Sequence, residues 1–245
     1  MLTLVNNVNN RGVIMNYKTK IYLILADASL EPIPPELWSD PLIKKHAKRQ
    51  KKSPKELILD QFYHGPAIVN SSLTDKEKRG RPDIVHRVIL LAQDSELNYR
   101  GFLRVYVHTV RGDLIAVDPS VKPPRNYLRF IGLMEQLFKE GRVPPEGRPL
   151  FSLTRTSLTS FLEKFRGNII GFSRRGKKVK DLKKFLIERI KNPSPLVLII
   201  GAFPRGFFSQ EVVRNLDELI AISDRSLTTS YVVCKVLSAL EELLI

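Results

Sequence analysis

A cluster of cations in the sequence has the spacing of a phosphate-binding surface. Lys122, Arg125 and Arg129 lie within eight residues, and Arg125 and Arg129 are four apart at the predicted start of a helix. Residues four apart on a helix share one face, so we expect both guanidinium groups to point the same way. A guanidinium pair beside a helix N-terminus is well placed to bind phosphate groups.

Three further charged residues lie upstream, in and beside another predicted helix. Arg81 and Asp83 flank Pro82 at the start of that helix, and Asp94 lies near its end. Taken alone, Arg81 and Asp83 are explained at least as well by a local ion pair, and Asp94 by a helix terminus. The sequence therefore marks these three residues as candidates without giving them a reaction.

Two common nucleotide-binding patterns are not met by the residues present. The glycines never take the G-x-G-x-x-G spacing of a dinucleotide-binding turn. Residues 171–178 match a phosphate-binding P-loop except at the last position, where Lys178 replaces the Ser or Thr that would hold magnesium. Two arginines inside this segment favour an RNA-contacting turn instead.

Metal and thiol chemistry are not indicated either. The single cysteine, Cys234, excludes a disulfide framework and any cysteine-based metal site. The four histidines show no metal-ligand spacing, and we expect them to be structural, hydrogen-bonded residues: His46, His64, His86 and His108.

The positive charge of the chain is concentrated in three short segments. The 245 residues carry a formal net charge of +15, from 40 Lys and Arg against 25 Asp and Glu. Segments 44–55, 122–129 and 174–184 hold 17 of the basic residues and one acid, so they carry +16 and the rest of the chain −1. Any one of these runs is explained by a solvated surface. Three of them on a neutral body favour a polyanionic partner such as nucleic acid.

A membrane partner is less consistent with the sequence. The longest apolar run, 196–203, is far shorter than the roughly 20 residues of a spanning helix. The Asn-rich N-terminus lacks the pattern of a signal peptide. We therefore expect a cytoplasmic protein, with residues 1–19 as a poorly ordered extension in which Met15 is an alternative start.

The apolar patterns predict an α/β fold with a mostly parallel sheet and helices on both faces. The first strand is the continuous apolar run 21–26, which follows the pattern of a strand buried on both faces. The prolines between residues 32 and 41 predict a loop, and 141–149 is a candidate internal boundary. Further strands are predicted at 102–109, 114–117, 168–172, 196–200 and 219–223. Helices are predicted from Ser53, from Arg81 to Ser95, after Pro124, near 157–166, near 179–191 and through Leu240.

Several motifs in a fixed order resemble one protein family. The N-terminal half contains R-P-D-I-V-H-R-V-I-L-L-A-Q-D-S-E-L-N (81–98), V-Y-V-H-T (105–109), L-I-A-V-D-P (114–119) and P-R-N-Y-L-R-F-I-G-L-M-E-Q-L (124–137). The C-terminal half contains G-A-F-P-R-G (201–206), I-S-D-R-S-L-T (222–228) and C-K-V-L-S-A-L-E-E (234–242). Together they are similar to the archaeal and eukaryotic ribosome-biogenesis methyltransferases of the Nep/Emg family.

The resemblance implies a fold and an activity. The fold is that of the SPOUT class, an α/β knot whose C-terminal chain forms a trefoil knot, with residues 20–245 as one domain and a basic insertion at about 30–80. The activity is methyl transfer from S-adenosylmethionine, with S-adenosylhomocysteine as product, to N1 of a pseudouridine in small-subunit rRNA.

The resemblance also implies roles for the candidate residues. The RNA would be bound by Arg81, Lys122, Arg125 and Arg129; Lys122 stands where relatives often have Arg. Arg81, Asp83 and Asp94 would form the catalytic group: Asp94 would accept or orient the N1 proton, and Asp83 would hold Arg81. The cofactor-binding residues would be Phe172, Gly201, Gly206, Ile222, Ser223, Asp224, Arg225, Ser226 and Leu227. The pair Arg225-Ser226 departs from the Tyr-Pro that the family usually has.

The partners implied are small-subunit rRNA, a second copy of the chain in a homodimer, and ribosomal proteins or assembly factors. The reaction requires no metal. The alternative is a non-catalytic rRNA-binding assembly factor on the same scaffold, which would use the same basic segments but would not need Asp94.

Overall fold

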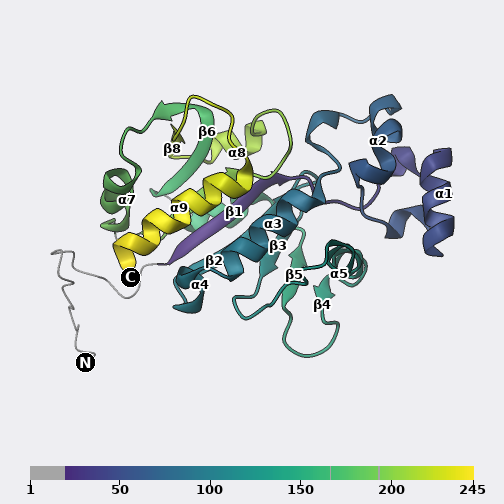
Figure 1. Ribbon diagram of the computed structural model, residues 1–245, viewed down its shortest axis with the longest axis horizontal. Helices are drawn as coiled ribbons and strands as arrows, with labels where there is room; N and C mark the ends of the chain where they lie inside the picture. Colours follow the sequence, from purple (N-terminus) through teal and green to yellow (C-terminus); the bar gives the residue numbers. More distant parts are fainter. Residues whose placement is uncertain (1–19, 166, 193) are drawn as a thin grey trace.

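The computed structural model describes residues 20–165, 167–192 and 194–245, and its centre is one eight-stranded sheet (Figure 1). The strand order is β4-β5-β3-β2-β1-β7-β6-β8. The strands are β1 (Ile21–Ala28), β2 (Leu103–Thr109), β3 (Leu114–Val117), β4 (Arg142–Val143), β5 (Phe151–Thr154), β6 (Ile169–Lys178), β7 (Leu196–Gly201) and β8 (Glu218–Ala221). Neighbouring strands in the run β2-β1-β7-β6-β8 pair in parallel. At the other edge of the sheet, β3, β5 and β4 pair antiparallel.

Helices cover both faces of this sheet, which confirms the predicted α/β class. The α-helices are α1 (Pro41–Gln50), α2 (Gln61–Asn70), α3 (Pro82–Gln93), α4 (Glu96–Tyr99), α5 (Tyr127–Glu140), α6 (Leu158–Leu162), α7 (Leu182–Ile190), α8 (Gln210–Arg214) and α9 (Thr229–Leu244). No helix within the described ranges combines the length and apolar character needed to cross a bilayer. The trefoil knot stays a prediction.

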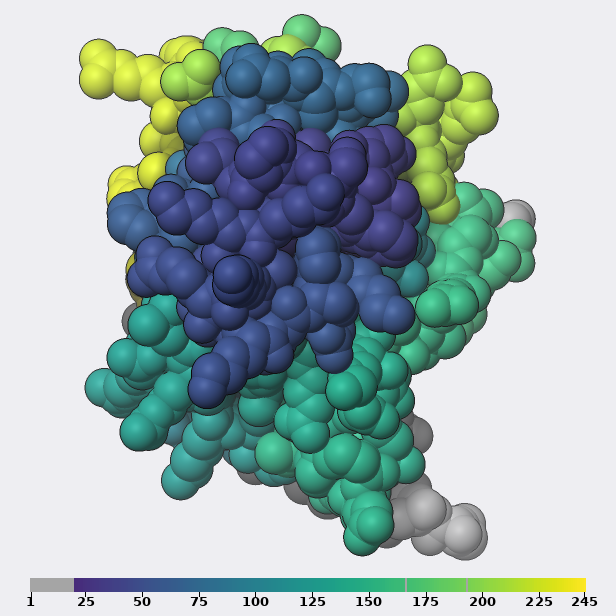
Figure 2. All heavy atoms as spheres, turned by 90° about the vertical axis from the view of Figure 1, so that its right-hand side faces the viewer, coloured from purple at the N-terminus to yellow at the C-terminus, as the bar shows by residue number. Residues whose placement is uncertain are grey.

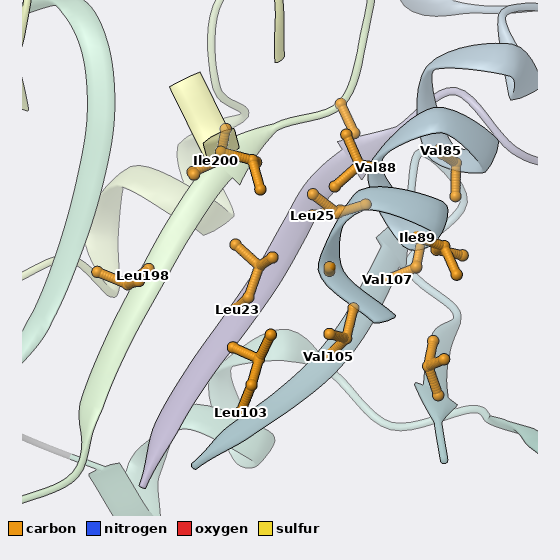
Figure 3. Close-up of a cluster of buried hydrophobic side chains, with 14 of the residues drawn as sticks. Leu23, Leu25, Val85, Val88, Ile89, Leu103, Val105, Val107, Leu198 and Ile200 are labelled. Atoms are coloured by element: carbon orange, nitrogen blue, oxygen red, sulfur yellow. The ribbon is translucent and has the colours of Figure 1, made fainter. Parts of the chain in front are cut away.

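The two faces of β1 serve two different cores. Leu23 and Leu25 belong to the larger core, which α3 and α9 cover, and Figure 3 shows Val85, Val88 and Ile89 of α3 above these strand side chains. The intervening Ile24 belongs to a second core with residues of α6 and α8. Burial on both faces explains why β1 is a continuous apolar run rather than an alternating one.

The segment 141–149 lies within this sheet. It contains β4, whose Val143 pairs with Phe151 of β5, and Gly141 at its start ends α5 in the left-handed conformation with φ +76°. Both strands were absent from the sequence prediction, because neither Arg-Val nor Phe-Ser-Leu-Thr is a continuous apolar run like the one at 114–117.

Residues 30–80, here called the insertion, form one end of the molecule (Figures 1 and 2). The insertion has a small core of its own, built from Ile33, Leu37, Ile43, Ala47, Leu57, Leu59, Ala67, Ile68 and Leu73. In the space-filling view it lies directly above the teal segment that includes α5 (Figure 2). Two ion pairs join it to α5, Lys52–Glu135 at 2.5 Å and Lys139–Glu56 at 3.6 Å.

The predicted loop and helix in the insertion are wrong in part. Helix α1 begins at Pro41, where a loop was expected, because Asp40 caps it by accepting the Leu42 N–H and because proline fits the first helical turn. The capping box of Ser53 and Glu56 is present, but the helix it starts is a single 3-10 turn. Backbone pairing of residues 57–59 with 31–33 then pulls the chain into an extended conformation.

The expected RNA-contacting turn at 171–178 is also wrong, because this segment is part of β6. The strand pairs with β8 through Phe172, is interrupted, and pairs again at Lys177 and Lys178. At the interruption Gly176 passes so close to Ile220 that a Cβ would lie 2.5 Å from its backbone. The basic side chains of this stretch face solvent, so no apolar pattern signals a strand.

The histidines are structural, as predicted, with one exception. His46 and His64 join α1 to α2 through a bond of 2.8 Å between their rings, and the Asp60 N–H donates to Nδ1 of the fully buried His64. His86 bonds to the Pro124 carbonyl at 2.7 Å. His108, however, has a buried Nε2 with no partner in the described part of the chain.

The His64 ring makes the insertion sensitive to acid. Burial, followed by the neighbouring His46, lowers the pKa of His64 to about 4, against about 6.5 for a free imidazole. The folded protein therefore binds fewer protons than the unfolded chain between these values. We expect the free energy of unfolding to fall by up to about 3 kcal/mol on this account as the pH drops from 6.5 to 4.

Chemical denaturation at a series of pH values tests this. The His64→Asn variant keeps an acceptor for the Asp60 N–H but does not titrate, so its free energy of unfolding should depend less on pH in this window. An equal pH dependence of variant and wild type would contradict the assignment.

Candidate active site

A cavity of about 420 Å³ opens at the ends of β7 and β8 and at the interruption of β6 after Phe172. Parallel strands bring their carboxyl ends to one edge, where ligands of α/β proteins commonly bind. Of the residues expected to bind a cofactor, eight line this cavity: Phe172, Gly201, Gly206, Ile222, Ser223, Arg225, Ser226 and Leu227. Asp224 does not line it, because its carboxylate pairs with Lys178.

The walls of this carboxyl-end cavity come from three segments. Ile200, Ile222 and Val232 supply apolar surface from β7, from the residue after β8 and from α9. The Thr229 hydroxyl donates to the Gly201 carbonyl at 2.8 Å and so ties the start of α9 to the end of β7. Gly201 has no room for a side chain, since a Cβ would lie 2.7 Å from the Phe203 ring.

Sequence reasoning missed the aromatic and cationic part of the wall. Phe203, Phe207 and Phe208 line the cavity from the loop after β7, and three phenylalanines within one six-residue loop stretch were an available signal. Three guanidinium groups lie at the same cavity, from Arg174, Arg205 and Arg225. None of the described residues that line it is acidic, so the cavity favours a ligand with negative charge.

Arg81 and Asp83 form a fork at the start of α3. The Arg81 Nε donates to Asp83 Oδ1 at 2.7 Å and its Nη2 to Oδ2 at 2.9 Å, while Arg87 also contacts this carboxylate. Partial burial acts to raise the pKa of Asp83, but the bonds from the two arginines outweigh it and lower the pKa. The bond to Asp83 raises the pKa of Arg81. Both groups are therefore charged at neutral pH, and Arg81 is held in one orientation.

A second cavity, of about 560 Å³, lies between the insertion and the starts of α3 and α5. Its lining residues are Asp60, Gln61, Phe62, Tyr63, Arg81, Asp83 and Tyr127. The Tyr127 hydroxyl donates to Asp60 Oδ2 at 2.5 Å, which joins α5 to the insertion. We call this space the insertion cavity.

The two cavities are linked through the carboxyl end of β1. The Arg81 N–H donates to the Ser29 hydroxyl at 2.7 Å, and the Ser29 N–H donates to the Ala202 carbonyl at 2.9 Å. Ser29 is fully buried, and Ala202 directly follows Gly201 of the carboxyl-end cavity. Arg81 is thus held beside the loop after β7 by two consecutive hydrogen bonds.

Asp27 and Lys78 reinforce this link. The buried Asp27 carboxylate accepts the Ser209 N–H at 2.6 Å and its hydroxyl at 2.9 Å, and lies 3.7 Å from the Lys78 ammonium. Lys78, from the insertion, also lies over the Phe203 ring, 5.4 Å from its centroid. Asp27 at the end of β1 therefore binds both the insertion, through Lys78, and the loop after β7, through Ser209.

The structure does not bring Asp94 to this place within one chain. Asp94 follows the last residue of α3, so it lies about 16 Å along the helix from Asp83 at 1.5 Å per residue. It is exposed, and its nearest cation is Arg125 at 3.9 Å. The expected catalytic group of Arg81, Asp83 and Asp94 is therefore not assembled by a single chain.

The cations after β3 are exposed, but not arranged as predicted. Arg129 lies in the first turn of α5, whereas Arg125 precedes the Asn126 cap, so a shared helical face does not apply to the pair. Lys122 is exposed on the segment leading to them. Every Lys and Arg of the three basic segments is exposed, which leaves this charge available to a partner.

Comparison with known proteins identifies the family. The family model described as EMG1/NEP1 methyltransferase matches residues 23–241. The chain belongs to the EMG1/NEP1 methyltransferase family.

Individual relatives in this family agree over nearly the whole chain. The ribosomal RNA small subunit methyltransferase Nep1 of Staphylothermus marinus is 41% identical over 233 residues, which cover 94% of this chain and 98% of that protein. Nep1 of Pyrococcus furiosus is 43% identical over 197 residues, covering 80% of this chain and 86% of that protein. The crystal structure of Archaeoglobus fulgidus Nep1 bound to S-adenosylhomocysteine superposes with a TM-score of 0.79 at 33% identity, covering 92% of this chain and 98% of that one.

Within the described residues of this EMG1/NEP1 family member, no group of three or more His, Cys, Asp or Glu side chains could hold a metal ion. The carboxyl-end cavity is lined by apolar, hydroxyl-bearing and guanidinium-bearing side chains, whereas the insertion cavity also has the carboxylates of Asp60 and Asp83.

The buried Asp27–Lys78 pair gives a stability prediction. Asp27→Asn tolerates the φ of +49° and can still bond Ser209, but it removes the charge opposite Lys78. We expect a loss of about 3 kcal/mol in the free energy of unfolding, because a buried cation is left unpaired. Adding Lys78→Met should restore at least half of this loss in denaturant titrations.

The control is Glu242→Gln, which breaks the exposed pair with Lys183 and should cost less than about 1 kcal/mol. Additive losses in the Asp27→Asn, Lys78→Met double variant would contradict the coupling of the two charges.

Proposed function

We propose that this protein transfers a methyl group from S-adenosylmethionine to N1 of a pseudouridine in small-subunit rRNA, and acts in small-subunit biogenesis in the cytoplasm. The observation that carries the proposal is the link through Ser29, which ties the backbone of Arg81 to the loop after β7, where the carboxyl-end cavity lies. Archaeoglobus fulgidus Nep1, of the same family, is described as bound to S-adenosylhomocysteine, and the archaeal relatives are named as rRNA methyltransferases.

The residues of the carboxyl-end cavity fit S-adenosylmethionine. Its volume of about 420 Å³ is within the range of small-molecule sites. Ile200, Ile222 and Leu227 offer apolar surface for an adenine ring, and the missing side chain of Gly201 makes room for the Phe203 ring in the cavity wall. The guanidinium groups at the cavity suit a carboxylate. When bound, the cofactor supplies an electrophilic methyl group on a sulfonium.

The substrate side is formed by the chain's own cations. Arg81, fixed by Asp83, would bind a phosphate near the target nucleotide, and Arg125, Arg129 and Lys122 would bind flanking phosphates. Lys122 would act here as a point charge, because an ammonium group cannot make the two parallel hydrogen bonds that a guanidinium makes to a phosphate. The target base must leave its stack to reach the carboxyl-end cavity, which favours an unpaired loop as substrate.

The N1 proton of the pseudouridine needs an acceptor or a group that orients it. Asp94 can take this role at the carboxyl-end cavity only if a second copy of the chain brings it there. On this proposal the protein works as a homodimer, with Asp94 of one copy serving the cavity of the other. Ribosomal proteins or assembly factors are further partners on the same proposal.

A methyl-transfer assay tests the proposed function. The full chain is incubated with S-adenosylmethionine carrying a labelled methyl group and a small-subunit rRNA hairpin with pseudouridine in its loop. The matched hairpin with uridine at this position has its N1 bonded to ribose, so N1 cannot be methylated. We expect label in the pseudouridine hairpin at least a hundredfold above the uridine control.

Tight binding of both hairpins without any transfer would contradict the enzyme and leave the non-catalytic assembly factor. Equal labelling of both hairpins would contradict the N1 target while leaving a methyltransferase.

A further inference from the structure

The insertion cavity contributes Arg81 and Asp83 to the proposed methyl transfer, but the rest of its lining has no part in that reaction, although it has the features of a binding site. Three helix starts meet around it, those of α2, α3 and α5, and they contribute three aromatic rings and the Arg81–Asp83 fork. Its volume of about 560 Å³ is ample for a planar ring of nucleobase size.

Phe62 is the most unusual residue of this cavity. Its side chain is 85% exposed, although a phenylalanine gains stability only by burial. The ring meets Tyr63 edge to face at 4.9 Å between centroids, and Tyr63 in turn stacks on His46 at 4.4 Å. The Phe62 ring is therefore supported by Tyr63 and His46, while its own face is exposed to solvent.

The polar groups at the cavity divide into those that are used and those that are not. Asp60 is occupied, because Oδ1 accepts the Phe62 N–H and Oδ2 the Tyr127 hydroxyl. Arg81 donates to Asp83 through Nε and Nη2, and its Nη1 has no partner among the described residues. The Gln61 side-chain amide likewise makes no hydrogen bond within the described ranges. The Arg81 Nη1 amino group, the Gln61 amino group and the Gln61 carbonyl are thus left for a ligand.

The surroundings of the cavity favour RNA over a protein partner. The basic segment 44–55 belongs to the insertion on one side, and 122–129 leads into α5 on the other. All ten Lys and Arg residues of these two segments are exposed. An exposed aromatic face flanked by cations is the arrangement by which proteins hold single-stranded nucleic acid.

We propose that the insertion cavity holds an unpaired base of the RNA other than the methylated one, with Phe62 as the surface on which it stacks, Gln61 at its edge and Arg81 on the phosphate near the target nucleotide. This inference rests on the proposed function. The target base belongs to the carboxyl-end cavity, on the far side of the Ser29 link, so the base at Phe62 is a neighbour of the target along the strand.

Binding of the pseudouridine hairpin to the full chain, followed by fluorescence anisotropy at fixed salt and without cofactor, tests this. Phe62→Ala should weaken binding by about fivefold to 150-fold, the range found when a stacking aromatic is removed. Phe62→Trp should keep the affinity within about threefold. The matched control is Val69→Ala, which truncates another exposed apolar side chain, 68% exposed at the other end of α2.

Hairpins with one abasic position identify the base. If Phe62 stacks on a base, one loop position other than the target should show the same affinity for wild type and Phe62→Ala once its base is removed. Equal affinities of Phe62→Ala and Val69→Ala, or a loss from Phe62→Ala that persists at every abasic position, would overturn the inference and reassign the cavity to a protein partner. The inference would also be overturned if wild type and Phe62→Ala had the same affinity only for the hairpin that is abasic at the target position.

The failure of this inference differs from the failure of the proposed function. Methyl transfer to the intact hairpin by wild type and by Phe62→Ala at saturating RNA reports on the reaction separately. If Phe62→Ala methylates the hairpin normally and binds it with unchanged affinity, the base-binding site is contradicted and the proposed methyl transfer is not.

Discussion

The buried end of β1 is the point on which both cavities depend. Ser29 accepts a hydrogen bond from the start of α3 and donates one to the loop after β7, so a single residue fixes both segments. Two residues earlier, Asp27 binds Ser209 and pairs with Lys78 of the insertion. Because Ser29, Asp27 and Lys78 are buried, each of their polar groups left without its partner would cost the desolvation of that group. The strand therefore specifies the relative positions of the two cavities far more tightly than surface contacts could.

The distribution of charge follows from this arrangement. The rest of the sequence is close to neutral, and the +16 of the three basic segments lies on exposed residues. Two of these segments flank the insertion cavity, and the third begins with Arg174, which lines the carboxyl-end cavity. Long-range attraction can then bring a polyanion to the surface, while the Arg81–Asp83 fork and the aromatic walls determine how it lies there.

Much of the fold was predictable where one physical cause dominates. The continuous apolar run at 21–26 marks a strand buried on both faces, and the motif 81–94 marks α3. Other elements were not predictable, because tertiary contacts outweigh local preference. Helix α2 contains Gly65 and Pro66, both unfavourable in helices, and its place is fixed instead by the bonds of Asp60 and His64.

The candidate site shows the same division. The loops around Gly201 and Ile222 could be recognised from sequence motifs, and the structure gathers most of their residues around one cavity. The link through Ser29 and Asp27 could not, because it joins residues up to 182 positions apart through single hydrogen bonds. The position of Asp94 could not be predicted from its motif either: it lies in the same motif as Arg81, but the length of α3 separates the two residues within one chain.

The most direct test of this account is the single-turnover rate of methyl transfer in Ser29→Ala. The variant keeps the backbone N–H that bonds Ala202 and loses only the hydroxyl that accepts the Arg81 N–H. The account predicts a rate at least tenfold lower, with the affinity for S-adenosylhomocysteine unchanged within about twofold. An unchanged rate in a variant that folds and binds the cofactor would show that Ser29 does not position Arg81 for the reaction.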